Sequence, residues 1–205
     1  MLSKKARCVK SCSNVKYERS LSSIFSDMSG FYHVPRYIFD PIGNSGLIDG
    51  AVLLPCDFDG QLEKQVRKTG IIEFTTNDCE ENLIDLVWWA SHKGKVDWVI
   101  AITQGMKDYT KWITECGLQV ATKGVCILDR LTFLEPTRAR EDFLQKSFLT
   151  NIKILSPRPS FRADGTTAKD PVTSAWFVFQ KASAAAVSTQ IDFEVGWHRP
   201  QDLKL

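Results

Sequence analysis

Two short apolar runs, with a helical pattern between them, organise the middle of the chain. Residues 97–105 and 124–136 each contain such a run, bounded by charge, glycine or proline. Between them, apolar residues recur at spacings of three and four: Met106, Tyr109, Ile113, Cys116 and Val120. Short apolar runs indicate strands, and the three-and-four spacing indicates an amphipathic helix. The pattern therefore predicts a strand-helix-strand unit.

The same runs set the fold class. Strands that are apolar on both sides are typical of a parallel sheet covered by helices on both faces. Further strands are predicted at 31–40, 71–76, 152–155 and 174–179, and helices at 61–68 and 136–146, with a short helix or strand at 83–90. We therefore expect an α/β protein with a single doubly wound, mostly parallel sheet.

Length and composition fit one domain. The chain has 205 residues, of which 43% are hydrophobic and 24% charged, as in soluble globular proteins. No run approaches the roughly 18 apolar residues of a membrane span, so no span is expected. We predict a basic arm at 1–28, a folded domain at 29–181 and a C-terminal tail at 182–205.

The positive charge is concentrated in the arm. Six basic residues stand against Glu18 alone in the first twenty positions: Lys4, Lys5, Arg7, Lys10, Lys16 and Arg19. A basic arm of this kind suits contacts with nucleic acid or with a larger protein complex. A transit peptide for an organelle is an alternative reading of the same segment.

Cysteine usage indicates an intracellular, cytoplasmic protein. The six cysteines are scattered, and several fall in or beside predicted core elements, which fits reduced thiols. Cys8 and Cys12 lack the matching second pair that a zinc site needs. No metal site is predicted.

A glycine-bearing turn follows the predicted strand at 31–40. Asp40 ends that strand, and Gly43 and Gly46 fall in the turn, where glycine lets backbone N–H groups approach a nucleotide-type cofactor closely. Asp78 follows the next predicted strand, where an acid can accept hydrogen bonds from ribose hydroxyls. A plain strand-to-helix turn, and an Asp78 that caps a turn and faces water, explain the same residues.

The loop at 157–171 carries cations beside an aromatic residue. Arg158, Arg162 and Lys169 accompany Phe161, a combination that can contact phosphates and stack on bases. A solvated hairpin loop is the alternative.

Residues 123–181 carry a resemblance to a known family. Segments of this region stand in the order that the family has: 124–128, 130–136, Arg138 and Arg140, 157–161, Asp164-Gly165 and 171–178. In these segments the chain resembles phage- and prophage-type DNA adenine methyltransferase relatives, which have the class I S-adenosylmethionine-dependent fold. The resemblance implies a Rossmann-like sheet with an antiparallel C-terminal strand, and S-adenosylmethionine held at Asp40, Gly43, Gly46 and Asp78. Asn44 stands where the family has a glycine.

The catalytic motif departs from the family. Its members follow the fourth strand with Asn or Asp, two prolines and an aromatic residue, which hold the adenine amino group and stack on the flipped base. Here those places hold Ile102, Thr103, Gln104 and Gly105. Isoleucine cannot orient an amine, and glycine offers no stacking surface. We therefore predict a methyltransferase-like protein with a degenerate catalytic motif; the alternative is a non-catalytic binding or assembly module that keeps only the fold.

Overall fold

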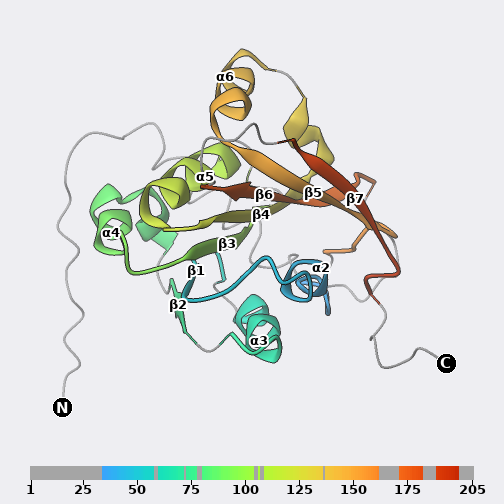
Figure 1. Cartoon of the computed structure of the whole chain (residues 1–205), viewed down its shortest axis with the longest axis horizontal. Helices are drawn as coiled ribbons and strands as arrows, with labels where there is room; N and C mark the ends of the chain where they lie inside the picture. Colours follow the sequence, from blue (N-terminus) through green and yellow to red (C-terminus); the bar gives the residue numbers. More distant parts are fainter. Residues whose placement is uncertain are drawn as a thin grey trace.

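A seven-stranded sheet in the order β2-β1-β3-β4-β6-β5-β7 runs through the protein, with helices on both faces (Figure 1). The structure is a computed structural model, and it describes residues 34–57, 60–71, 73–77, 80–103, 106, 109–135, 137–161, 171–181 and 188–198. The strands are β1 (Val52–Leu54), β2 (Phe74–Thr76), β3 (Trp98–Ile102), β4 (Gly124–Arg130), β5 (Leu149–Ser156), β6 (Ser174–Gln180) and β7 (Gln190–Val195).

Strand directions confirm the predicted fold class. β2, β1, β3 and β4 are parallel neighbours. β6 lies antiparallel between β4 and β5, and β7 pairs in parallel with β5. The sheet is therefore of the α/β type, mostly parallel, with one antiparallel strand near the C-terminus.

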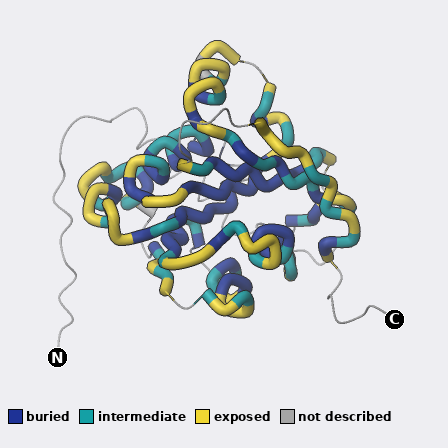
Figure 2. Tube along the Cα trace, in the orientation of Figure 1, coloured by how far each residue is buried: buried dark blue, intermediate teal, exposed yellow. Residues whose placement is uncertain are grey.

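The helices divide between the two faces. They are α2 (Asp40–Gly43), α3 (Gln61–Lys68), α4 (Leu86–Ser91), α5 (Tyr109–Val120) and α6 (Arg138–Lys146), with 3-10 turns η1 (Glu80–Ile84) and η2 (Leu131–Leu134). α2 and α3 contribute to one apolar cluster, and α4, α5 and α6 to the other. Figure 2 shows the central strands buried between these layers.

The predicted strand-helix-strand unit is β3, α5 and β4. All five residues of β3 are buried, with Val99 and Ala101 in one cluster and Trp98, Ile100 and Ile102 in the other. Burial on both faces explains why the sequence reads as an uninterrupted apolar run. Gly124 opens β4 where a Cβ would meet the Phe179 carbonyl oxygen and the Trp98 ring.

The predicted strand at 31–40 is wrong. Within it, the described residues from 34 onward form turns, and Asp40 begins the short helix α2 with Pro41 in its first turn. Ile38, Phe39 and Ile42 are fully buried. The Trp176 indole N–H donates to the Ile38 carbonyl oxygen at 2.8 Å, so this segment packs on the sheet as an added layer. The first strand is β1, which the sequence pattern missed.

The C-terminal residues also differ from expectation. β7 lies within the segment predicted as a tail and adds a strand to the sheet. Trp197 follows it, buried, and donates its indole N–H to the Pro157 carbonyl oxygen at 2.7 Å.

None of the described helices combines the length and the apolar character that crossing a membrane requires. Among the described residues, no group of three or more histidine, cysteine or acidic side chains is arranged to hold a metal ion.

Candidate functional site at the carboxyl ends of β1 and β3

The order of the strands reverses at β1. The chain passes from β1 to β2 on one side and then crosses to β3 on the other side of β1. In open α/β sheets, ligands bind outside the carboxyl ends of the strands at such a reversal. We call the carboxyl ends of β1 and β3, with the loops that follow them, the switch point (Figure 1).

Asp57 organises the loop after β1. It is 5% exposed. Its carboxylate accepts hydrogen bonds from the N–H groups of Leu62 at 2.9 Å and Glu63 at 2.6 Å. These N–H groups belong to the first turn of α3, where an intrahelical partner is lacking and negative charge is favoured. Gly60, with φ +66°, makes the turn into the helix. The N-terminus of α3 is thus capped by the protein's own carboxylate.

Asn77 ties the end of β2 to the same loop. Its side chain is buried, and its Nδ2 donates to the Pro55 carbonyl oxygen at 3.0 Å. Its Oδ1 accepts from Asn82 Nδ2 at 2.9 Å. The amide therefore fixes the backbone of the β1 loop from the neighbouring strand.

A buried polar chain lies behind the end of β3. Thr110 Oγ1, on α5, lies 2.5 Å from Asp129 Oδ2 and 3.1 Å from Thr103 Oγ1. A hydroxyl has one proton to donate, so Thr110 gives it to the ionised carboxylate and accepts from Thr103. The Thr103 N–H donates to the Leu128 carbonyl oxygen at 2.9 Å. These bonds join β3, β4 and α5 at the edge that carries the switch point.

Burial raises the pKa of the Asp129 carboxyl to about 6, against the weaker opposing effect of hydrogen bonds from Thr110 and the Arg130 backbone. The side chain is 8% exposed, and its second oxygen accepts from the Arg130 N–H at 2.7 Å. Desolvation favours the neutral acid here. The group is therefore ionised at neutral pH but takes up a proton under mildly acidic conditions.

The described half of the degenerate motif packs into the protein. Ile102 ends β3 at 6% exposure, and Thr103 has no exposed surface. Gln104 and Gly105 lie outside the described residues. The two described positions therefore present no polar group to a ligand.

The other predicted cofactor residues lie elsewhere. Gly43 approaches Thr69, which caps the C-terminal end of α3. Asp49, three positions after Gly46, accepts from the Trp98 indole at the start of β3. Gly43 therefore lies beside the end of α3 opposite its Asp57 cap, and Gly46 lies in the segment between α2 and β1.

Asp40 begins α2, beside Gly43 rather than at the end of a strand. Burial raises the pKa of its carboxyl, while Lys68 acts in the opposite direction. Asp78 lies outside the described residues.

The predicted nucleic-acid residues are described in part. Arg158 is exposed, and its guanidinium donates to the Pro171 carbonyl oxygen at 2.5 Å. Arg162 and Lys169 lie outside the described residues.

Sequence reasoning missed Asp57 and Asp129, and of residues 76–78, which include Asn77, it chose Asp78 as the candidate. The signal for Asp57 was available: Val52-Leu53-Leu54 is an apolar run, and Asp57 and Gly60 lie between it and the predicted helix at 61–68. An acid and a glycine between a strand and a helix are typical of a cofactor-binding turn. Asp57 and Gly60 fit this pattern no less well than the residues at 40–46. No pattern pointed to Asp129, because its partners are distant in the sequence.

Comparisons with known proteins find distant structural likenesses. No family model and no curated protein matches the chain. A modification subunit of a putative type I restriction enzyme from Vibrio vulnificus is similar in structure, with 9% identity and a TM-score of 0.48 over 85% of this chain and 49% of that one. The chain thus spans about half the length of that subunit.

Two further solved structures are similar. One is a putative class I S-adenosylmethionine-dependent methyltransferase from Listeria monocytogenes, with 11% identity and a TM-score of 0.46 over 82% of this chain and 67% of that one. The other is a predicted O-methyltransferase from Agrobacterium tumefaciens, with 12% identity and a TM-score of 0.36 over 70% of this chain and 66% of that one.

Proposed function

We propose that the chain is a methyltransferase-like protein that binds S-adenosylmethionine at the switch point and does not recognise an adenine base. The observation that carries this proposal is the reversal of strand order at β1, with the carboxyl ends of β1 and β3 side by side. Such a position is the general ligand site of open α/β sheets. The bound cofactor would supply an electrophilic methyl group on a sulfonium sulfur.

The cap on α3 favours this cofactor over a dinucleotide. Nicotinamide and flavin dinucleotides place their pyrophosphate on the N-terminus of the helix after the first strand. Here Asp57 already accepts the Leu62 and Glu63 N–H groups, and its negative charge opposes a phosphate. S-adenosylmethionine has no phosphate, so it does not compete for those groups.

The packing of β3 supports the loss of base recognition. Recognition of a flipped adenine needs a polar group and a stacking surface at the end of this strand. Ile102 is buried in the core, and the Thr103 hydroxyl is engaged with Thr110. Cofactor binding without methylation of adenine is therefore the expected behaviour.

Calorimetric titration with S-adenosylmethionine tests the proposal. Binding is expected for the full chain, and Asp57→Asn should weaken it at least about fivefold, because a neutral side chain holds the α3 turn less firmly. Glu63→Gln is the matched control, since it removes one negative charge from the same helix and keeps the backbone N–H that Asp57 accepts. A labelled-methyl assay on adenine-containing DNA should stay at background. Absence of binding at millimolar cofactor, or equal binding of a nicotinamide dinucleotide, would refute the assignment.

The second candidate is a non-catalytic module that associates with nucleic acid or with a larger complex through the basic arm. Six cations in the first twenty residues favour it. This candidate predicts DNA binding that weakens steeply as the salt concentration rises and that disappears when residues 1–20 are deleted. Binding of DNA without binding of S-adenosylmethionine would favour this candidate over the first.

A further inference from the structure

β7 exposes its apolar side chains. Ile191, Phe193 and Val195 are 58%, 69% and 81% exposed. They alternate with Gln190, Asp192 and Glu194, which lie on the other face of the strand. In an ordinary outer strand the apolar side chains of such an alternation turn toward the core. A row of three exposed apolar side chains therefore indicates an interaction site.

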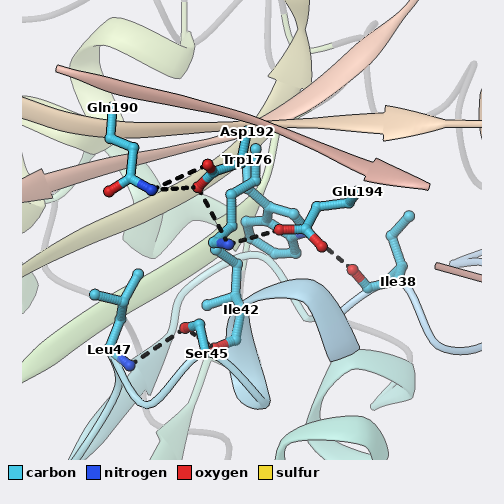
Figure 3. Close-up of polar contacts among 9 residues, drawn as sticks. Ile38, Ile42, Ser45, Leu47, Trp176, Gln190, Asp192 and Glu194 are labelled. Carbon is cyan, nitrogen blue, oxygen red and sulfur yellow. Dashed lines mark hydrogen bonds and ion pairs between the residues drawn. The ribbon is translucent and has the colours of Figure 1, made fainter. Parts of the chain in front are cut away.

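The opposite face of β7 carries excess negative charge (Figure 3). Lys153 Nζ, on β5, lies 2.6 Å from Glu194 Oε1 and 3.7 Å from Asp192 Oδ2. Gln190 Nε2 donates to both Asp192 oxygens. One ammonium serves two carboxylates, so one negative charge on this face has no counterpart within the cluster.

The apolar row continues into a groove. Ile191 and Phe193 pair in register with Ile152 and Ile154 of β5. Ile152, Ile154 and Ile191 line an open cavity of about 630 Å³, together with Leu131 and Leu134 of η2. The exposed row is thus the outer part of a larger apolar surface.

β7 also has a free edge. It is the last strand in the order of the sheet, and among the described residues no strand pairs with its second side. Alternate N–H and C=O groups of such a strand point outward and can pair with an incoming strand.

We propose that β7 is a docking strand for an extended segment of a partner protein with alternating apolar and basic side chains. The backbone of that segment pairs with the free edge. Its apolar side chains extend the row of Ile191, Phe193 and Val195, and its basic side chains meet Asp192 and Glu194. A second copy of this chain fits less well, because antiparallel pairing of two β7 strands sets acids beside acids.

Nuclear magnetic resonance on the isotope-labelled full chain tests the proposal. The probe is a capped nine-residue peptide of alternating valine and lysine, compared with a peptide in which glutamate replaces lysine. The lysine peptide should shift the amide signals of residues 190–195 and slow their exchange with solvent. Its affinity should fall as salt is added.

Three variants identify the surface. Phe193→Ser removes apolar contact, and the paired change Asp192→Asn with Glu194→Gln removes the charge; each should weaken binding of the lysine peptide at least fivefold. Val195→Ser repeats the apolar test at the most exposed position, where the fold is least affected. Val87→Ser is the control, because Val87 is also a largely exposed valine, at 72%, on α4.

Three results would overturn the proposal. The first is equal binding of the glutamate peptide, and the second is the absence of shifts at 190–195 with either peptide. The third is a dimer in sedimentation experiments that Phe193→Ser dissociates, which would make the occupant a second copy of the chain.

Discussion

The Thr110 hydroxyl lies 2.5 Å from the Asp129 carboxylate and joins the first turn of α5 to the end of β4. Thr103, at the end of β3, bonds to the same hydroxyl. The position of Thr103 thus depends on a carboxylate that is almost fully buried. A buried polar network favours a single arrangement of the fold when every member has its hydrogen-bond partners. When one member is removed, its partners stay buried and unpaired, which lowers the stability of the fold.

Asp129→Asn should change how stability depends on pH. The pKa of Asp129 is raised to about 6 in the folded protein, so between roughly pH 4 and pH 6 the folded state holds a proton that the unfolded state has released. Folding stability from this group is therefore fully present below about pH 4 and is lost as the pH rises, by on the order of 3 kcal/mol at neutral pH. The asparagine variant should lack this loss.

Urea denaturation at pH 4.5, 5.5 and 7 measures the effect. The control is Asp142→Asn, which neutralises an exposed acid on α6. The same pH slope in wild type and in Asp129→Asn would argue against the raised pKa.

Gly50→Ala should destabilise the protein more than Gly46→Ala. Both glycines have positive φ, +82° and +72°, and a side chain there costs about 1–2 kcal/mol. A Cβ at Gly50 would also meet the Asp97 carboxylate, which accepts the Ala51 N–H at 3.1 Å and the Thr122 hydroxyl at 2.5 Å. A Cβ at Gly46 meets nothing within 4 Å.

Displacing Asp97 should add at least about 1 kcal/mol to the cost of Gly50→Ala. Thermal unfolding of the two variants gives the comparison directly. Equal midpoints would mean that Asp97 moves aside without loss.

Trp176→Phe should cost about 1–3 kcal/mol of folding stability, because it leaves the buried Ile38 carbonyl group without its indole donor. Trp112→Phe is a matched control. The Leu83 carbonyl oxygen accepts from the Trp112 indole at 2.8 Å but also from the Trp89 indole at 3.0 Å, so it keeps a partner. Chemical denaturation should show the larger loss for Trp176→Phe, and the reverse order would contradict the role given to Ile38.

Continuous burial made β3 and β4 predictable from the sequence. β3 and β4 each hold at least five successive buried residues, so their apolar runs are long enough to recognise. β1 has only three residues, and Pro55 follows it directly, so the run is too short to stand out. The apolar residues at 31–40 were misread because Ile38, Phe39 and Ile42 form one side of a helical turn and not the face of a strand.

β7 escaped recognition for a different reason. Ile191, Phe193 and Val195 alternate with polar residues, which is a strand pattern. Their side chains are exposed, so β7 adds none of them to the apolar core. The polar chain at Asp129 was also beyond sequence reasoning. Thr103, Thr110 and Asp129 come from three separate elements, and only the parallel pairing of β3 with β4 brings them together.

Thr103→Pro should destabilise the protein by about 2–4 kcal/mol. The Thr103 N–H donates to the Leu128 carbonyl oxygen at 2.9 Å, and proline has no N–H to donate. The change also removes the hydroxyl that bonds to Thr110. Thr103→Val is the control, since it keeps the N–H and the shape and should cost about 1 kcal/mol.

Urea denaturation of the two variants measures the difference. Under the proposed function, Thr103 corresponds to the first proline of the adenine-methyltransferase motif, so a large penalty for proline would mean that the backbone at this position does not accept that motif. A Thr103→Pro variant as stable as Thr103→Val would instead mean that the backbone after β3 can accept a proline at this position.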